Sequence, residues 1–321
     1  MFRLALLLIA PGLLAAQVPR VGAIEVYGVR KVPEDSILKA LGLAVGDRLP
    51  ASKLDAEDRV SELPGVAGAR LEAVCCTGDR AILYVGVQEE GGRSVTFRKP
   101  PNGPERLPED TIEPYKEFIR AFEDAARKGN TAEDTSEGHP LAYAPNVRRI
   151  QERFRGIIPH RISILRRVLR ESADPSHRAA AAAMIGYAPD KQQAENDLED
   201  ALRDPDEGVR ANALRALAAM AGRRDVKIHV SAVADLLDSL VWSDKRRSAE
   251  ALVAITSSRP AECANLRDSG PALREMAHWK TPEHAHAAFV LLGRISGMKE
   301  EAINTAWEKD KDSLLKLFPA R

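Results

Sequence analysis

The sequence contains few cysteines and few aromatic residues, and its charges balance. Three cysteines in 321 residues are too few to hold a fold together as a disulfide scaffold. The 47 Lys and Arg residues equal the 47 Asp and Glu residues in number, so no net charge draws the chain to nucleic acid or to anionic lipid. After the N-terminus no run of 18 or more apolar residues occurs. We therefore expect a mature chain that is soluble and lacks a transmembrane helix.

The chain also lacks the short motifs that mark common enzymes. It contains no GxSxG, no phosphate-binding GxxxxGK[ST], no GxGxxG after a strand and no HExxH. The one histidine cluster comprises His278, His284 and His286. Because His284 and His286 are two positions apart on an expected helix, their side chains diverge by about 200° and cannot share one metal ion. We expect no catalytic residue, no cofactor and no metal; a carboxylate pair formed only by folding would escape this search.

The first 16 residues have the layout of a secretory signal peptide. Residues 1–3 carry a positive charge, residues 4–10 are apolar, and residues 14–16 offer small side chains for cleavage. The apolar run is too short to span a bilayer, and no cysteine follows it for lipid attachment. We therefore expect an exported protein located in the periplasm, with a retained N-terminal anchor as the alternative.

Residues 21–90 are expected to form a small domain of their own. Alternating apolar residues predict strands at 24–27, 66–75 and 81–87, and helical spacing predicts helices at 33–43 and 52–63. Ser52 is the expected N-cap of the second helix, and Thr77-Gly78-Asp79 suits a hairpin turn. The order of these elements is β-α-α-β-β.

Residues 91–145 are expected to join this domain to the rest of the chain. The stretch Lys99–Pro104 predicts a hinge without regular structure, and residues 131–138 predict an exposed acidic loop. Between them, residues 111–128 predict an amphipathic helix whose apolar side chains pack on and cap the helices that follow. These side chains are Ile112, Tyr115, Phe118, Ile119 and Phe122.

The C-terminal half contains an imperfect repeat. Its clearest copy runs from Asp204 to Gly222, and weaker copies begin at Asp174, Asp244 and Thr281. Each copy has a turn-forming start and then an Ala- and Leu-rich helix. The aligned positions are Arg178, Arg210, Lys245 and Ala285, spaced 32, 35 and 40 residues apart. Because one helix pair cannot bury its apolar face alone, the pairs must stack, which predicts an α-solenoid over residues 146–321.

The helix boundaries within the solenoid follow from local signals. At positions 174–175 and 204–205 an Asp-Pro pair predicts a helix with Asp as its N-cap and Pro at its first position. The second helices of the pairs are expected at 190–202, 225–240, 260–277 or part of that range, and 299–318.

Two parts of the chain resemble known families. The strand I-x-V-x-G ending at Gly28, the connection Gly46-Asp47-Arg48-Leu49, the L-P-G-V at Leu63–Val66 and the closing strand Tyr84–Glu89 resemble a POTRA domain. This resemblance implies a module that binds client polypeptides, partly by adding a strand to an exposed sheet edge; a three-stranded sheet has two such edges.

The repeat D-P-D-x-x-V-R-x-x-A-x-x-A-L that begins at Asp204 resembles the HEAT repeat, in the short bacterial version also found in phycobilin lyases. The resemblance implies stacked helix pairs, and it leaves the function open because such arrays serve many tasks. HEAT-type deoxyhypusine hydroxylases hold two irons with paired His-Glu dipeptides, and this chain contains no such dipeptide.

A concentration of arginine between Arg148 and Arg170 is the candidate binding surface. Three interpretations remain open: a solvated helix face, a site for an acidic protein segment or anionic envelope component, and a nucleic-acid site. The residues chosen as candidates for partner binding are Arg166, Arg167 and Arg170. The full set is Arg148, Arg149, Arg153, Arg155, Arg161, Arg166, Arg167 and Arg170.

The adjacent cysteines Cys75 and Cys76 lie on an expected strand, where neighbouring side chains point to opposite faces. We expect a structural role for both. A redox or metal role and a disulfide to Cys263 are the alternatives.

Together these patterns predict a multidomain α+β protein, with a POTRA-like domain followed by an all-α HEAT-like solenoid. We expect a non-catalytic exported scaffold that binds protein or peptide partners in cell-envelope assembly, without nucleic acid or a cofactor. One alternative is a HEAT-type lyase or hydrolase acting on an envelope substrate, which a cleft gathering carboxylates or histidines would favour. Nucleic-acid binding through residues 148–170 is the other alternative.

Overall fold

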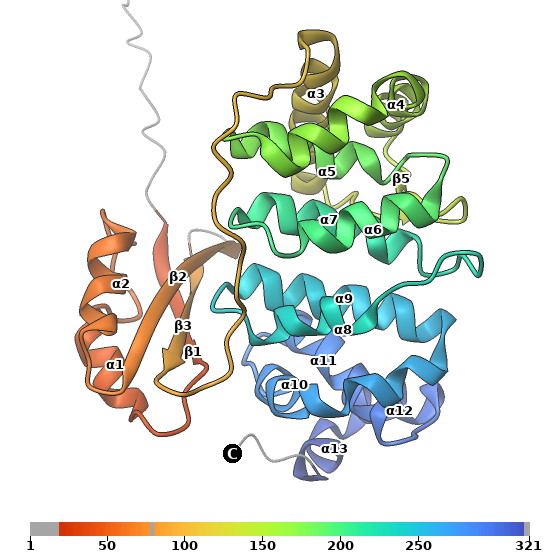
Figure 1. The fold of residues 1–321 in the computed structure, drawn as a ribbon. Coiled ribbons are helices and arrows are strands. Elements are labelled where there is room, and N and C mark those ends of the chain that lie inside the picture. Colours follow the sequence, from red (N-terminus) through yellow and green to blue (C-terminus); the bar gives the residue numbers. More distant parts are fainter. Residues whose placement is uncertain (1–18, 78–79, 318–321) are drawn as a thin grey trace, which may run out of the picture.

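A small sheet domain and an array of helices lie side by side in the computed structural model, which describes residues 19–77 and 80–317 (Figure 1). The chain leaves the sheet domain through an extended segment that runs along the array before it enters the first helices. This mixed architecture, a small sheet followed by a helical region, is the predicted fold class. Among the described residues, none of the helices combines the length and the apolarity needed to cross a lipid bilayer.

The sheet domain has the element order predicted from the sequence. It contains β1 (Arg20–Tyr27), α1 (Glu34–Leu41), α2 (Lys53–Ser61), β2 (Val66–Thr77) and β3 (Arg80–Glu89). Strand β3 lies between β1, to which it is parallel, and β2, to which it is antiparallel. Helices α1 and α2 cover one face, with a core that includes Ile37, Leu41, Val60, Leu83 and Val85. Ser52 accepts a hydrogen bond from the Asp55 N–H, as its predicted role of N-cap requires.

The segment from residue 90 to residue 108 contains no helix or strand and is held along the array. The Arg98 N–H donates to the Arg203 carbonyl at 2.7 Å, and the Gly103 N–H donates to the Glu171 carbonyl at 2.8 Å. The Arg210 guanidinium lies over the Phe97 ring, 4.1 Å from its centroid. The predicted hinge is therefore bound to the helices and does not hang free between the two parts.

Helix α3 (Glu109–Arg127) packs on the first long helix, α4 (Pro145–Glu171), as its apolar face predicts. The Phe118 ring meets the Phe154 ring edge-on at 5.8 Å. The predicted exposed loop at 131–138 is instead partly ordered, because β4 (Glu133–Asp134) pairs with β5 (Leu141–Ala142). An ion pair between Glu133 and Arg215 fixes this short hairpin to the array.

Ala-rich helices stack in series through the array. The helices after α4 are α5 (Pro175–Ile185), α6 (Lys191–Ala201), α7 (Glu207–Ala219), α8 (Val230–Asp235), α9 (Trp242–Ser258), α10 (Gly270–Ala277), α11 (Pro282–Ile295), α12 (Glu300–Lys309) and α13 (Lys311–Leu317), with 3₁₀ helices η1 (Leu236–Asp238) and η2 (Pro260–Ser269). The four copies of the repeat are α5, α7, α9 and α11, and each packs on the next. The intervening α6, α8, α10 and α12 pack against them as a second layer.

Three of the predicted second helices are interrupted in the structure, and the one expected at 299–318 is divided at Asp310 into α12 and α13. The helix expected at 225–240 begins only at Val230 and ends in η1, because the preceding loop is bonded to α6: the Lys227 N–H donates to the Gln192 side chain at 2.7 Å. The α-helix expected within 260–277 occupies only Gly270–Ala277, and Pro260–Ser269 form a 3₁₀ helix. A new α-helix starts at Gly270 because Pro271 has no N–H to continue the earlier one.

The predicted cap at Asp174 is confirmed, whereas the one at Asp204 is wrong. Asp174 accepts from the Ser176 N–H with Pro175 at the first helical position. Helix α7 instead starts at Glu207 with Asp206 as its N-cap. The Asp204 carboxylate is turned inward, fully buried, and accepts two hydrogen bonds of 2.9 Å from the Arg178 guanidinium.

The aligned basic positions of the repeat form what we call the charge ladder. Its three contacts are Arg178–Asp204 at 2.9 Å, Arg210–Asp244 at 2.7 Å and Lys245–Glu275 at 3.9 Å. The first two contacts each join one repeat to the following one, and the third joins α9 to α10, the second helix of the same pair. Arg210 and Asp244 are only 1% and 2% exposed, so each charge depends on its partner for compensation. The fourth aligned residue is Ala285, which offers no charge, and the ladder ends there.

Some predictions fall on parts that the structure does not describe. The predicted signal peptide, residues 1–16, lies outside the described residues, as do Gly78 and Asp79 of the predicted hairpin turn. Cys75 and Cys76 belong to β2, but their side chains are also outside the description. Cys263 is a free thiol.

We expect Asp244→Ala to lower the free energy of unfolding by about 3–5 kcal/mol, because Arg210 would keep a buried charge without its partner. Urea unfolding followed by circular dichroism measures this change. The matched control in the same helix is Glu250→Ala, which removes the partially exposed pair with Arg246 and is expected to cost about 0–1 kcal/mol. Equal losses in the two variants would contradict the role of the charge ladder.

Candidate interaction surface

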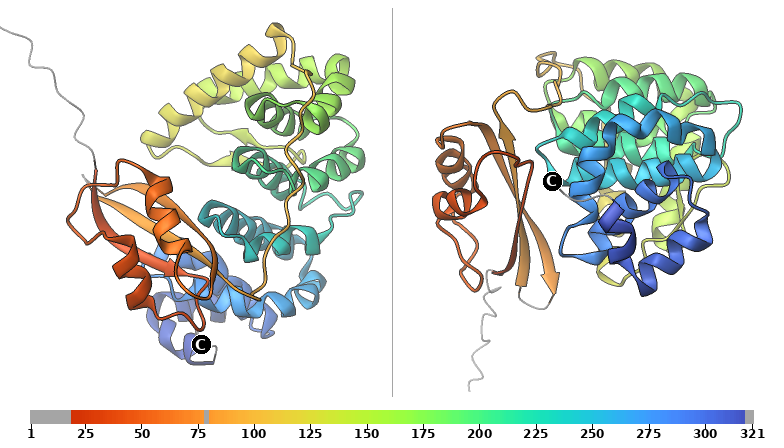
Figure 2. Two further views of the ribbon diagram at one scale, coloured as in Figure 1. Left: turned by 60° about the vertical axis from the view of Figure 1, so that its left-hand side comes forward. Right: turned by 90° about the horizontal axis from the view of Figure 1, so that it is seen from below.

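The sheet packs its second face directly on the helical array, away from α1 and α2 (Figure 2). Residues alternate along β3, so that Leu83 and Val85 face the helices of the sheet domain while Tyr84 faces the array. The Tyr84 ring stacks on Trp242 with centroids 4.6 Å apart, and its hydroxyl lies 2.5 Å from Nδ1 of His284. The two parts of the chain are therefore docked.

Carboxylates from both sides of this interface accept hydrogen bonds from backbone N–H groups of the other side. Glu72 of β2 accepts from Trp242 N–H at 2.5 Å and Ser243 N–H at 3.3 Å, at the start of α9. Helix α9 has no side-chain cap of its own, so Glu72 supplies one from the sheet. Glu25 of β1 accepts from Lys280 N–H at 3.0 Å. In the opposite direction, Glu275 accepts from Gly28 N–H at 2.6 Å.

Burial at this interface raises the pKa of the Glu25 and Glu72 carboxyls above the ordinary 4.5, against the lowering effect of their backbone donors. Burial also raises the pKa of Tyr84 to about 12, so this phenol stays protonated through neutral pH. The interface is thus held by desolvated acceptors and by uncharged aromatic groups.

Close approach of the two parts depends on Gly86 of β3. A Cβ at this position would lie 2.3 Å from the Leu240 carbonyl oxygen and 2.6 Å from the Tyr27 hydroxyl. That same hydroxyl donates to the Leu240 carbonyl at 2.6 Å. No side chain larger than hydrogen fits between the strand and the array here, because contacts below 3 Å are repulsive.

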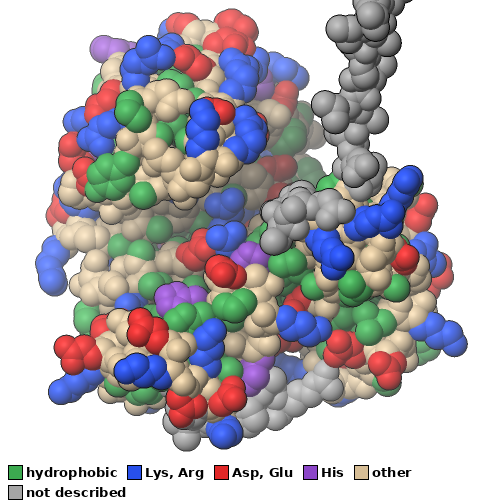
Figure 3. Space-filling view, turned by 180° about the vertical axis from the view of Figure 1, so that it is seen from behind, with side chains coloured by type: hydrophobic (Ala, Val, Ile, Leu, Met, Phe, Trp, Pro, Cys, Tyr) green, Lys and Arg blue, Asp and Glu red, His purple; other side chains and the backbone are tan. Residues whose placement is uncertain are grey.

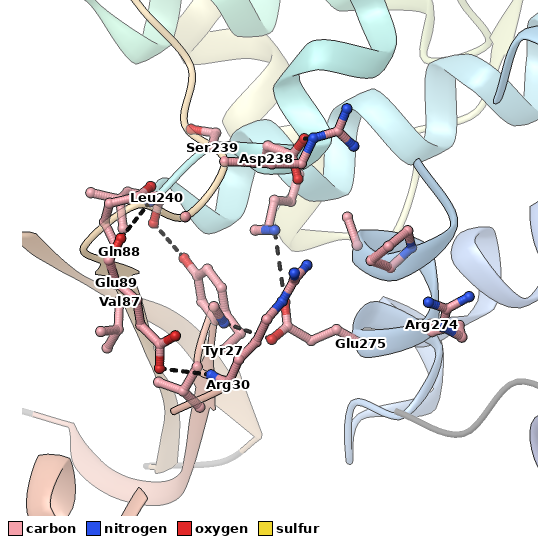
Figure 4. A pocket seen from close by; sticks show the side chains of 17 residues that line it. Tyr27, Arg30, Val87, Gln88, Glu89, Asp238, Ser239, Leu240, Arg274 and Glu275 are labelled. Atoms are coloured by element: carbon pink, nitrogen blue, oxygen red, sulfur yellow. Dashed lines mark hydrogen bonds and ion pairs between the residues drawn. The ribbon is translucent and has the colours of Figure 1, made fainter. Parts of the chain in front are cut away.

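A cavity of about 430 Å³ lies at the same interface (Figure 4). Its charged residues are Arg30, Glu89, Arg93, Asp238, Lys245, Arg274 and Glu275. Glu89 accepts from the N–H groups of Arg30, Lys31 and Val32 at 2.7–2.8 Å, and these donors lower its pKa although burial acts to raise it.

Two charged residues of the cavity, Lys245 and Glu275, are likewise bound to other groups of the protein. Lys245 donates to the Leu237 carbonyl at 2.5 Å and lies 3.9 Å from Glu275, and burial lowers its pKa. Glu275 in turn holds the Gly28 N–H. The cavity is therefore part of the contact between the two domains, with Glu89, Lys245 and Glu275 engaged in holding it.

Of the two sheet edges expected to be open, that of β1 is covered at its start. Residues 46–49 bond there to residues 19–21: Val21 N–H donates to the Asp47 carbonyl at 2.8 Å, and the Val21 carbonyl accepts from Gly46 N–H at 2.8 Å. On β2 the Leu71 N–H donates outward to the Glu57 carboxylate at 2.7 Å. In the described residues, no strand pairs with that side of β2.

Along a β-strand, the backbone N–H and C=O groups of successive residues point alternately to the two sides of the strand, and this determines which groups of β2 point outward. Because Leu71 points its N–H outward, Ala69 and Ala73 present their N–H and C=O groups on the same side. Ala73 is exposed, and the Glu57 carboxylate is bonded to the N–H of Leu71. The edge near Ala73 can therefore accept an additional strand.

The candidate arginines lie on α4, at the opposite end of the array from the sheet (Figure 1). Arg166 forms a 2.6 Å ion pair with Asp197 of α6. Arg167 and Arg170 are exposed. Five arginines of the cluster pair with acids, so much of its charge is neutralised locally. These pairs are Arg148–Glu152, Arg153–Glu117, Arg155–Glu137, Arg161–Asp110 and Arg166–Asp197.

The histidines at the C-terminal end contact different neighbours. His284 belongs to the interface with Tyr84, while His286 meets the Trp307 ring edge-on at 4.7 Å. The Nδ1 atom of His278 lies 2.7 Å from the Arg274 carbonyl. The side chains of His284 and His286 therefore diverge, as their spacing predicts.

Sequence reasoning missed the docking residues, although one signal was present. Residues Ala81–Val85 are apolar at every position, which is typical of a strand buried on both faces and not of one that is half exposed. Glu25, Glu72 and Glu275 gave no signal, because an acidic residue that caps a distant backbone group looks like any surface acid in the sequence.

We expect Gly86→Val to separate the sheet from the array, because its side chain would collide with Leu240 and Tyr27. The measurement is limited proteolysis of residues 90–108, which should become at least tenfold faster. Gly222→Ala is the control, since a Cβ there meets nothing within 4 Å. Unchanged proteolysis in Gly86→Val would contradict the docked arrangement.

We also expect Glu25 and Glu72 to contribute more to the stability of the interface in mild acid than at neutral pH. A carboxyl whose folded-state pKa is raised contributes its full stability below the unfolded pKa, and this contribution is lost as pH rises through the folded value. Urea unfolding at pH 5 and pH 7 tests this. Glu72→Gln keeps an acceptor but cannot titrate, so it should reduce the pH dependence; an unchanged dependence would contradict the assignment to Glu72.

Comparison with known proteins identifies only the array. A search of curated proteins finds no match to the chain. A family model for HEAT repeats matches residues 162–256, from within α4 to the end of α9. The match includes the first two contacts of the charge ladder, Arg178–Asp204 and Arg210–Asp244. The C-terminal region is therefore a HEAT-like helical array, an architecture that offers long surfaces to protein partners.

Proposed function

We propose that this protein is a non-catalytic scaffold that holds polypeptide partners, and that one segment of a partner adds to the open edge of β2. The observation that carries the proposal is this edge, which is exposed at Ala73 and with which no strand of the described residues pairs. An unpaired edge offers backbone N–H and C=O groups in the spacing that an extended peptide matches.

The protein's own extended segment supports a polypeptide as the ligand of the array. Arg98 inserts its guanidinium between the Leu169 carbonyl, at 2.6 Å, and the Asp204 carboxylate, at 2.5 Å. Its N–H donates to the Arg203 carbonyl. The ends of the stacked helices thus hold an extended chain through both backbone and side-chain contacts. An extended segment of a partner chain could be held by contacts of the same type.

The shape and charge of the surface also favour protein partners. From behind, the surface is hollowed between the sheet domain and the first helices of the array, and side chains of both signs are interspersed around it (Figure 3). A surface of mixed charge suits a polypeptide better than a polyanion. The pairing of five α4 arginines with acids weighs in the same direction against nucleic acid.

Export and an envelope role are part of the proposal and depend on the first 16 residues, whose charge and apolar pattern is that of a signal peptide. The POTRA-like character of residues 21–90 is also proposed, on the strength of the β-α-α-β-β order. The open edge and this order fit a module for client polypeptides in the periplasm.

We expect Ala73→Pro to weaken peptide binding at least tenfold, since proline removes the outward N–H while an edge strand tolerates it. Binding is measured by fluorescence anisotropy with labelled peptides as long as β2, composed of alternating apolar and polar residues. Ala73→Ser, which keeps the N–H, is the matched control and should bind like the natural chain. If both variants bind equally well, the edge is not the site; if neither the natural chain nor Ala73→Ser binds, the scaffold proposal fails.

A further inference from the structure

Two glutamates and one histidine converge on the side of the array formed by α6 and the loop before α8. Glu195 and Glu199 are four residues apart on α6, so their side chains share one helix face. His229 ends the loop that leads into α8, in the next repeat. One ligand atom of each residue lies within 4.8 Å of the others. The sequence search for metal ligands missed this group because its members come from two repeats.

The Glu195 carboxylate is buried, and its basic neighbour is the His229 ring, whose Nδ1 lies 3.4 Å from Glu195 Oε1. The Glu195 side chain is 1% exposed, and it accepts from the His229 N–H at 3.1 Å and the Gln192 amide at 3.2 Å. In the described chain, neither Lys nor Arg forms an ion pair with Glu195 or Glu199. Because an uncompensated buried carboxylate is costly, this place favours a positive charge.

The ring of His229 provides a second and independent observation. Its Nδ1 atom lies 2.5 Å from Glu199 Oε2 and 3.4 Å from Glu195 Oε1. Despite these short distances, Nδ1 is buried and has no hydrogen-bond partner of suitable geometry. A neutral ring nitrogen this close to two carboxylates is placed as a ligand atom would be, whereas a protonated ring would form ion pairs with them.

From this geometry we infer that Glu195, Glu199 and His229 bind a divalent transition-metal ion, with Zn²⁺ the best fit. Two carboxylate oxygens and one imidazole nitrogen form a ligand set that Zn²⁺ accepts, and three protein ligands leave a coordination position open. Glu199 also lines a cavity of about 460 Å³, bounded by residues 93–96, from which solvent reaches the group.

Gln192 contacts both a proposed ligand, Glu195, and the loop that carries His229. Gln192 holds Glu195 through its amide nitrogen and accepts from the Lys227 N–H at 2.7 Å. It thereby orients a ligand and fixes the loop that carries His229, which is the task of outer-shell residues at metal sites. The bound ion would join α6 to the loop before α8, and so connect two consecutive repeats.

The test is calorimetric titration of the untagged, chelator-treated full chain with Zn²⁺. We expect one ion per chain, with binding weakened at least tenfold in Glu199→Gln, a near-isosteric change, and in His229→Ala. His160→Ala removes an exposed histidine outside the group and should bind normally. Circular dichroism confirms that the variants are folded.

Substitution with Co²⁺ gives a readout that distinguishes this site from thiol binding. We expect visible ligand-field bands without the intense near-ultraviolet band of thiolate ligands, and loss of the visible bands in Glu199→Gln. No binding of Zn²⁺, equal binding by the two variants and the control, or a thiolate band would each overturn the inference. The test is independent of peptide binding at β2.

Discussion

Three carboxylates that reach across the contact between sheet and array determine the rest of this structure. Glu72 caps the start of α9, Glu25 holds the Lys280 N–H, and Glu275 holds Gly28 from the other side. Each satisfies a backbone donor that has no partner within its own part of the chain. These contacts set the orientation of the sheet, and they bring Tyr84 onto Trp242 with Gly86 against Leu240. Consequently one face of the sheet is closed against the array.

Buried charges are also paired with opposite charges within the helical array. Two contacts of the charge ladder connect consecutive repeats, and the third, Lys245–Glu275, connects α9 to α10, where Glu275 also takes part in the sheet contact. Asp204 accepts from Arg178 and from Arg98 of the extended segment. The ladder therefore ties together the repeats, the connecting segment and the sheet domain. In this way a chain of separate modules acquires a fixed mutual arrangement, which a scaffold needs if it is to present two surfaces at once.

Sequence reasoning worked where the signal was local. The period of the apolar residues located β3 and α3, Ser52 was identified as a cap, and the alignment of Arg178, Arg210 and Lys245 found the positions that form the ladder. It failed where a distant partner decides. The sequence around Asp204 is typical of a helix N-cap, yet its carboxylate accepts hydrogen bonds from a buried guanidinium, which are stronger than a capping bond to a backbone N–H.

The candidate sites show the same limit. Glu195, Glu199 and His229 are brought together only by the stacking of repeats, and the freedom of the β2 edge depends on which edge residues 46–49 cover. Conversely, Arg166 was chosen for its neighbours in sequence, but the fold pairs it with Asp197. Charge density along a helix does not say which charges remain available once adjacent helices have supplied acids.

The central claim is that the sheet domain is rigidly docked on the array through one face. Its most direct test is a pulsed electron–electron resonance measurement of the distance between spin labels at Asp58 in α2 and Arg167 in α4, both exposed, after the native cysteines have been replaced by serine. A docked interface gives one narrow distance distribution that stays unchanged on dilution. A broad distribution, as expected for two domains on a flexible connection, would contradict the account.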